Sequence, residues 1–296
     1  MTKLNNFVEV FFRAVTYRLF RSMYAYYIKY FSSGYPAMYV YPRDTAGWAT
    51  ISYGVWERWN IESSVVLIEK LSKLSEYQKI KNSRPTLALD VGANLGIYTI
   101  NLAKKFDKLV AVEASPIVSK VLEANILTNQ LEENVDLKVI ALGDDEKAHE
   151  MNVNLSSSGL SSFQAVTTGK IKKVRIQMYR GDTLLKANYP DHCLTFIKCD
   201  VEGYELNVMR GLKNRLQQDF PLIQIEHDGR NPQAAEVLQF LHSLGYHHMY
   251  ARDGIIPRYL RPLFGSLGIW PKLVKITNVK PRFYQAIWLS DKVISL

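Results

Sequence analysis

The chain has 296 residues, 47% of them hydrophobic, which is enough for one large folded domain with appendages and excludes a disordered protein. Its two cysteines, Cys193 and Cys199, are too few for a disulfide framework and lack the spacing of a zinc site, which favours a reducing compartment. Residues 85–253 carry a net charge of −3 within a chain of +9. A core that bound nucleic acid would be basic, so we expect no nucleic-acid partner.

The positive charge is concentrated at the two ends. Residues 1–84 contain twelve Lys/Arg against six Asp/Glu, and residues 254–296 contain seven against one. Basic flanks of this kind favour contact with an acidic partner or an anionic membrane surface. We therefore expect a cytoplasmic protein, with a peripheral position on the cytoplasmic membrane face as the alternative.

Residues 7–31, FVEVFFRAVTYRLFRSMYAYYIKYF, contain no glycine or proline and are predicted to be helical. Charges such as Glu9, Arg13 and Arg18 interrupt every apolar run well before the roughly 18 residues of a membrane span, and they fall on most sides of the helix. The segment therefore packs on its own domain or on a second protomer, or else lies on a membrane surface. The oligomeric state stays open.

A second helix is predicted after the motif GVWE, which contains Trp56 and Glu57. The polar stretch KIKNSRP, residues 79–85, then separates a helical lead-in region, residues 1–84, from the core, residues 85–296. The second predicted helix, which follows GVWE, has apolar residues at helical spacing, namely Val65, Val66, Ile68 and Leu71.

The stretch TLALDVGANLGIYTIN, residues 86–101, contains an apolar strand, a turn with two glycines and the start of a helix. Gly92 and Gly96 let the backbone approach a ligand closely. A dinucleotide fingerprint has a glycine where this chain has Asn94, and Asp90 at the strand end would repel a phosphate. A carboxylate there suits the ammonium and sulfonium groups of S-adenosylmethionine. We predict this cofactor, with NAD as the open alternative.

Glu113 ends the second predicted strand, KLVAVE, about 20 residues beyond the glycine turn, where an acid can bind both ribose hydroxyls of an adenosine. The helix that follows begins at Ser115. The next strand, VDLKVIALGDD, is predicted to end with Ala141 and Leu142 beside the adenine. Extended pieces at residues 151–155 and 173–179 then flank SSSGLSSF, which is either a mobile lid or a plain surface loop.

Two further strands end on polar residues. LTFIKCD ends at Asp200, followed by the helix VEGYELNVMRGLKNRL, and PLIQIEH ends on Glu226 and His227. Because the carboxyl ends of parallel strands lie at one edge, we expect these residues to share a crevice with Asp90 and Glu113. The last predicted strand spans residues 283–289.

The acids at the start of that helix have two interpretations. Glu202 and Glu205 either face an acceptor or only stabilise the helix N-terminus. Residues 254–282, before the last strand, contain no acid, six Lys/Arg and several apolar side chains. This basic insertion is predicted to seat a lipid-linked or anionic acceptor.

The motifs DVGANLGIYT, VEASP, IKCDVEGYELNVMRGL and IQIEH together resemble the FkbM family of S-adenosylmethionine-dependent methyltransferases, over about residues 44–290. The resemblance implies an α/β Rossmann-like class I methyltransferase fold, with a seven-stranded mixed sheet whose last strand is antiparallel. It also implies S-adenosylmethionine as methyl donor and a hydroxyl acceptor. We therefore expect an O-methyltransferase that acts on a sugar hydroxyl of a glycan, polysaccharide or related metabolite. A lipid-linked or other non-sugar acceptor, an NAD-dependent oxidoreductase and a non-catalytic membrane module remain the alternatives.

A sugar hydroxyl is a poor nucleophile while protonated, so a base or a metal must help to remove its proton. His227 or Asp200 is the predicted base, with Lys198 and Glu226 positioning or polarising the acceptor. Alternatively, Asp200, Glu202 and Glu226 hold a divalent cation. The predicted acceptor pocket also includes Glu57 and Glu205. The predicted cofactor-binding residues are Asp90, Gly92, Asn94, Gly96, Tyr98, Glu113, Ala114, Ala141 and Leu142.

Overall fold

The computed structural model describes residues 36–40, 58–73, 78, 83–154, 163, 171–228, 232–253, 272–277 and 283–294. The predicted helix 7–31, Trp56 and Glu57 lie outside these residues. Of the predicted Ser/Gly loop only Phe163 is described, and of the basic insertion only residues 272–277. No helix in the described ranges is long and apolar enough to cross a lipid bilayer.

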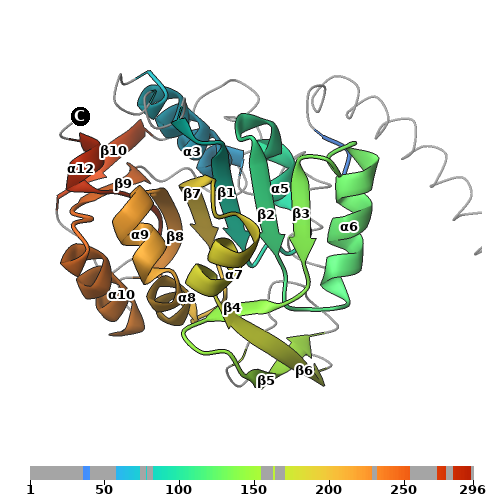
Figure 1. Cartoon of the computed structure of the whole chain (residues 1–296). Helices are drawn as coiled ribbons and strands as arrows, with labels where there is room; N and C mark the ends of the chain where they lie inside the picture. The colour runs from blue at the N-terminus through green and yellow to red at the C-terminus, as the bar shows by residue number, and fades with distance from the viewer. Residues whose placement is uncertain are drawn as a thin grey trace, which may run out of the picture.

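The core of the fold is an eight-stranded mixed sheet in the order β10-β9-β11-β8-β7-β1-β2-β3 (Figure 1). Strands β3, β2, β1, β7 and β8 run parallel, β11 runs antiparallel to β8 and β9, and β10 runs antiparallel to β9. The predicted α/β fold with a mixed sheet and an antiparallel last strand is confirmed. The eighth strand, β10, comes from the basic insertion and was not predicted. The strands are β1 (Thr86–Val91), β2 (Lys108–Val112), β3 (Val135–Lys138), β7 (Cys193–Cys199), β8 (Leu222–Asp228), β9 (His248–Asp253), β10 (Lys272–Ile276) and β11 (Phe283–Leu289).

A second sheet has three strands in the order β4-β6-β5: β4 (Ala141–Gly143), β5 (Ala148–Asn154) and β6 (Ile171–Arg180). It lies on the side of the main sheet where β1, β2 and β3 end (Figure 1). The prediction of one continuous strand for VDLKVIALGDD was therefore wrong. The run VIAL is apolar throughout, but Val139 is exposed, and the chain passes there from one sheet to the other.

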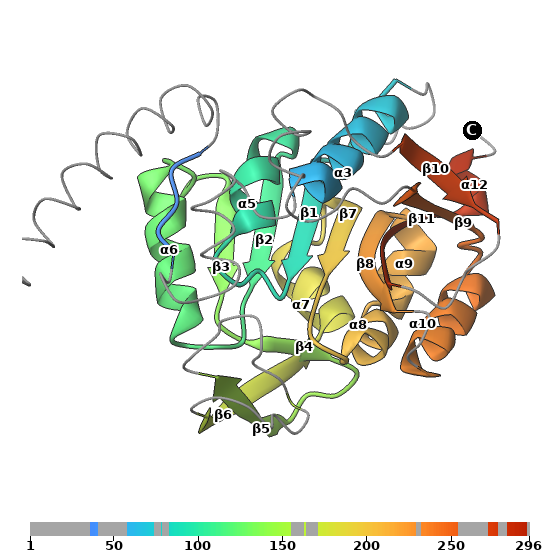
Figure 2. The same ribbon diagram turned by 180° about the vertical axis from the view of Figure 1, so that it is seen from behind.

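Helices cover both faces of the main sheet. Figure 2 shows α3 (Arg58–Leu71), α5 (Ile97–Leu102) and α6 (Val118–Thr128) on one face. Figure 1 shows α7 (Gly181–Asn188), α8 (Glu205–Gly211), α9 (Lys213–Asp219) and α10 (Pro232–Ser243) on the other. The short 3-10 helix η1 (Ala103–Lys105) continues α5, and α12 (Asp291–Ile294) follows β11. The helix predicted after Asp200 is two helices, which break at Leu212.

Helix α3 packs against the same apolar core as α5 and the main sheet. Ile68 and Leu71 are buried as predicted, but Val66 is 40% exposed, so its assignment to the apolar face was wrong. The buried stripe instead includes Ile61 and Ser64, the latter with no exposed surface. Because a polar serine occupies a core position, the apolar run VVLI alone does not show which of its residues face the core.

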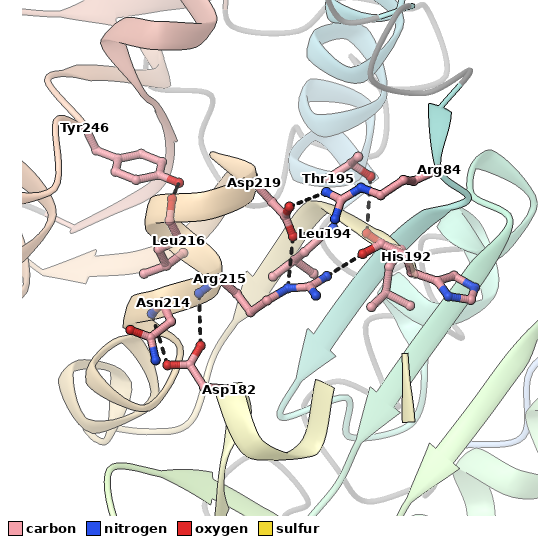
Figure 3. A network of polar contacts seen from close by, with 11 residues as sticks. Arg84, Asp182, His192, Leu194, Thr195, Asn214, Arg215, Leu216, Asp219 and Tyr246 are labelled. Atoms are coloured by element: carbon pink, nitrogen blue, oxygen red, sulfur yellow. Dashed lines mark hydrogen bonds and ion pairs between the residues drawn. The ribbon is translucent and has the colours of Figure 1, made fainter. Parts of the chain in front are cut away.

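At the amino ends of β1 and β7, a buried carboxylate ties α9 to the sheet (Figure 3). The fully buried side chain of Asp219 pairs with Arg84, just before β1, and with Arg215 of α9. Its Oδ2 also accepts the backbone N–H of Leu194 at 3.0 Å. Arg215 in turn donates to the carbonyl of His192 at 2.6 Å. This network fixes the end of the sheet opposite to the predicted crevice.

Replacing Asp219 with alanine is expected to lower the free energy of unfolding by about 3 kcal/mol, because it leaves the charge of Arg215 buried and uncompensated. Chemical denaturation measures the change. Glu69→Ala is the control, because Glu69 makes an exposed ion pair with Lys105 and should change stability by less than about 1 kcal/mol. Equal effects of the two substitutions would contradict the proposed role of Asp219.

Candidate active site

Three acids lie at the carboxyl ends of three neighbouring strands. Asp90 is the penultimate residue of β1, Glu113 directly follows β2, and Asp200 directly follows β7. Backbone hydrogen bonds hold these ends together, with Gly92 N donating to Val112 O at 3.0 Å and Asp200 N donating to Val91 O at 3.1 Å. The structure thus brings the three predicted acids to one edge.

Gly92 is required where the glycine turn passes the end of β7. Its φ is +73°, a conformation that side chains with a Cβ rarely adopt, and a Cβ there would lie 1.9 Å from the carbonyl oxygen of Asp200. The backbone of the turn therefore touches the residue that ends β7. This contact places the predicted cofactor loop directly beside the predicted catalytic acid.

Glu113 is 7% exposed, and both of its carboxylate oxygens are oriented by the backbone. Oε2 accepts the N–H of Asn94 at 2.9 Å, and Oε1 accepts the N–H of Ser115 at 2.7 Å. Burial raises the pKa of Glu113, while these two hydrogen bonds lower it. Each oxygen keeps a lone pair with which it can accept a ligand hydroxyl.

A buried lysine joins the acids of β1 and β7. Lys198 is 6% exposed, and its Nζ donates to the carbonyl of Gly92 at 2.9 Å. The same Nζ lies 3.7 Å from Asp90 Oδ1 and 3.6 Å from Asp200 Oδ2. Burial raises the pKa of Asp90, against the lowering effects of Lys198 and of the Thr99 hydroxyl, which donates to Asp90 Oδ2 at 2.6 Å. Lys198 thus holds the glycine turn and balances charge between two carboxylates.

Lys198 belongs to a polar row that was not predicted from the sequence. Asp90, Lys198 and Gln224 are paired in register across β1, β7 and β8. Gln224 donates to the hydroxyl of Tyr98 at 2.6 Å and accepts a hydrogen bond from Ser64 of α3. Lys198 Nζ lies 5.2 Å from the centre of the Tyr98 ring. Tyr98, a predicted cofactor ligand, therefore contacts Gln224 through its hydroxyl and Lys198 through its ring. The signal in the sequence was a polar residue inside each of two apolar strands, Lys198 in β7 and Gln224 in β8.

The predicted adenine-side residues separate into two groups. Ala114 and Ala141 belong to the apolar cluster of the second sheet, which also contains Ile117. Leu142 instead packs into the main core, because successive residues of β4 point to opposite faces. Of the predicted pair Ala141 and Leu142, only Ala141 therefore lies in the same cluster as Ala114, which follows Glu113.

The loop after Asp200 carries the other two acids. Glu205, the first residue of α8, accepts the backbone N–H groups of Val201 at 3.2 Å and Gly203 at 3.1 Å with its Oε1, so its carboxylate fixes the loop that precedes the helix. Glu202 has a positive φ of 52° and is exposed. Partial burial, with repulsion from Asp200 and Glu205, raises its pKa to about 7.

Strand β8 carries the two remaining predicted residues, Glu226 and His227. Glu226 is half-buried on the face that Gln224 shares, and the side chain of His227 lies outside the described part of the structure. Among the described residues, no three His, Cys, Asp or Glu side chains form a group that could hold a metal ion. Asp200, Glu202 and Glu226 are therefore not assembled as a metal site.

Glu202→Gln is expected to raise the melting temperature at pH 8 by roughly 1–2 °C relative to the wild type, and to leave it unchanged near pH 4. The folded protein keeps Glu202 protonated up to about pH 7, whereas the usual pKa is 4.5, so its contribution to stability is lost as the pH rises between these values. The effect is small because the residue is exposed. Thermal unfolding between pH 4 and 8 measures it.

Glu123→Gln, which changes an exposed residue on α6, is the control and should show no such pH dependence. A melting temperature of Glu202→Gln that falls below that of the wild type as the pH rises would contradict the assignment.

Comparison with known families decides between the classes that the sequence left open. The profile of the Methyltransferase FkbM domain matches residues 90–247, which is more than half of the chain. The chain belongs to the FkbM methyltransferase family. Membership of this family implies S-adenosylmethionine as the methyl donor, and the match begins at Asp90, the first acid of the site. No curated protein sequence is significantly similar to the chain.

Solved methyltransferase structures are similar to this FkbM methyltransferase at low identity. The FkbM methyltransferase of Methylobacillus flagellatus KT is 14% identical with a TM-score of 0.39, and the match covers 74% of this chain and 47% of that one. This chain thus spans about half of that chain. The human methyltransferase 10 domain containing protein is 12% identical with a TM-score of 0.44, covering 83% and 92%. A SAM-dependent O-methyltransferase from Thermotoga maritima is 12% identical with a TM-score of 0.39, covering 86% and 66%.

The residues of the site fit the cofactor of this family. Asp90 Oδ1 and Asn94 Oδ1 are buried without a hydrogen-bond partner among the described residues. Buried acceptors of this kind are costly unless a ligand satisfies them. S-adenosylmethionine carries an ammonium, two ribose hydroxyls and an adenine amine, which can donate to the free oxygens of Asp90 and Asn94 and to the remaining lone pairs of Glu113.

Proposed function

We propose that this FkbM methyltransferase is an O-methyltransferase that acts on a sugar hydroxyl of a glycan, polysaccharide or related metabolite, with Asp200 as the general base. The observation that carries the proposal is the position of Asp200. Its Oδ2 lies 3.6 Å from Lys198 Nζ, which is bonded to the carbonyl of Gly92 in the cofactor loop. A carboxylate next to that loop can take a proton from an acceptor hydroxyl.

The chain's residues divide the work between binding and proton removal. When bound, S-adenosylmethionine supplies an electrophilic methyl group on a sulfonium. Glu113 orients the ribose, and Asp90 with Asn94 accepts the remaining donors. Asp200 accepts the hydroxyl proton as the acceptor oxygen attacks the methyl group, and Lys198, whose Nζ lies 3.6 Å from Asp200 Oδ2, holds that carboxylate beside the cofactor loop. In this proposal Glu226 orients the acceptor, His227 is the alternative base, and Glu202 lies at the outer side of the site.

A lipid-linked or other anionic acceptor is the second candidate. The basic flanks favour it, since residues 254–282 carry six Lys/Arg and no acid. Such an acceptor, like the proposed membrane contact of the flanks, would place the enzyme at an anionic surface.

The test is transfer of labelled methyl from S-adenosylmethionine to glycan, lipid-linked and protein fractions of the native cell. We expect label in the glycan fraction, released on hydrolysis as an O-methyl sugar. Label in the lipid fraction alone would support the second candidate, and label only in protein would overturn both. A parallel reaction with a chelator tests the divalent-cation alternative, because metal-dependent transfer would stop.

A further inference from the structure

A short segment that precedes the core lies along helix α6. Residues 36–40, which we call the N-terminal strap, run beside α6 in Figure 2. The side chain of Met38 packs against the core cluster that contains α5 and α6, while Tyr39 is 58% exposed. The backbone of the strap, rather than its exposed aromatic ring, makes the polar contacts.

Two asparagines of α6 hold that backbone. Asn125 Oδ1 accepts the N–H of Tyr39 at 2.5 Å, and Asn125 Nδ2 donates to the carbonyl of Tyr39 at 3.0 Å. Asn129 Nδ2 donates to the carbonyl of Ala37 at 2.7 Å. The amide of Asn125 therefore pairs with one residue of the strap through both its donor and its acceptor, as a neighbouring strand would.

The same amide also reaches into the cofactor loop. Asn125 Nδ2 donates to the carbonyl of Leu95 at 2.8 Å, and Asn125 has no exposed surface. Leu95 lies between Asn94, whose N–H orients Glu113, and Gly96. Since Leu95 is itself fully buried, its carbonyl depends on Asn125 rather than on water.

Helix α6 contacts the next residue of the turn as well. Gly96 has a φ of +89°, and a Cβ there would lie 2.5 Å from Leu122 Cδ1. Leu122 and Asn125 are three residues apart, so both point from one face of α6 to the glycine turn. The position of the turn is thus set by this face.

We infer that Asn125 is a positioning residue for cofactor binding, and that the N-terminal strap completes the cofactor site by fixing the Asn125 amide. The strap supplies the N–H and the carbonyl that orient the amide, and the amide then holds the Leu95 carbonyl of the glycine turn. Residues outside the family match, which begins at Asp90, therefore contribute to the affinity for S-adenosylmethionine. The inference rests on the cofactor assignment above.

The first experiment compares two asparagines with the same chemistry. Asn125→Ala is expected to raise the dissociation constant for S-adenosylmethionine about tenfold, measured by calorimetry on the full chain, and to raise KM for the cofactor more than it lowers kcat. Asn134→Ala is the matched control. Asn134 Nδ2 also donates to two carbonyls, those of Phe106 at 3.0 Å and Asp107 at 3.1 Å, but at the opposite end of the sheet.

The control should lower the melting temperature without changing cofactor affinity. Wild-type affinity in a folded Asn125→Ala protein would overturn the inference. A wild-type protein that does not bind S-adenosylmethionine would instead overturn the cofactor assignment, so the two failures are distinguishable.

The second experiment isolates the strap and does not depend on the stability of Asn125→Ala. Tyr39→Pro removes the backbone N–H that Asn125 accepts, whereas Tyr39→Ala keeps it and removes only an exposed ring. We expect weaker cofactor binding in Tyr39→Pro and wild-type binding in Tyr39→Ala. Wild-type affinity in both variants would overturn the role of the strap, and an equal loss of affinity in both would overturn it by assigning the effect to the ring.

Discussion

Replacing Asp200 with asparagine is expected to lower kcat by about 10²- to 10⁴-fold, the contribution typical of a general base. The amide has nearly the same shape as the carboxylate, but at neutral pH it cannot accept a proton from a hydroxyl. The side chain is 26% exposed at the end of β7, so we expect the fold and the affinity for S-adenosylmethionine to be retained. Turnover is measured as transfer of labelled methyl to the fraction that the wild type labels, and cofactor binding is measured by calorimetry.

Asp191→Asn provides the control for this variant. Asp191 is exposed in the turn that precedes β7, at the other end of the same strand, and its substitution should leave kcat unchanged. Normal turnover in Asp200→Asn would remove Asp200 from the mechanism and leave His227 as the predicted base.

Replacing Lys198 with methionine is expected to lower the free energy of unfolding by about 3–5 kcal/mol. Methionine fills a similar volume, but it leaves the buried carboxylate of Asp90 without the ammonium that lies 3.7 Å away. It also removes the hydrogen bond to the Gly92 carbonyl, so we expect the affinity for S-adenosylmethionine to fall at least about tenfold. Chemical denaturation and calorimetry measure the two effects.

A double substitution separates the charge from the packing. Adding Asp90→Asn to Lys198→Met should recover part of the lost stability, because no uncompensated buried carboxylate remains. Lys105→Met is the surface control, since Lys105 pairs with Glu69 in solvent and should change stability by less than about 1 kcal/mol. If Lys198→Met is as stable as the wild type, the lysine does not balance Asp90.

Local sequence patterns were sufficient for the elements around the cofactor loop. The strand before Gly92, the acid that ends β2 and the acid that follows β7 all lie where the pattern predicted them. Each depends only on a short apolar run and the polar residue that ends it. The last strand, Phe283–Leu289, has the bounds predicted from the residues, and its antiparallel direction is the one that the family resemblance implied.

Contacts between distant segments could not be predicted in this way. The split of VDLKVIALGDD between two sheets depends on the pairing of β4 with β6, whose partner residues lie about 37 positions further along the chain. The role of Ser64 depends on Gln224, 160 residues away. In both cases the local residues are compatible with more than one partner.

The sequence by itself determined the strands and the turn around the cofactor loop, the three acids at strand ends and the family to which they point, because each of these follows from residues that are neighbours in the chain. Only the tertiary structure decided that Lys198 joins Asp90, Asp200 and the Gly92 carbonyl. The same holds for the contact of Gln224 with Tyr98 beside that lysine, and for the link that Asn125 makes between Tyr39 and Leu95. The physical reason is that a buried polar group must find its partner in space. Its own strand or helix does not specify which distant residue that partner will be.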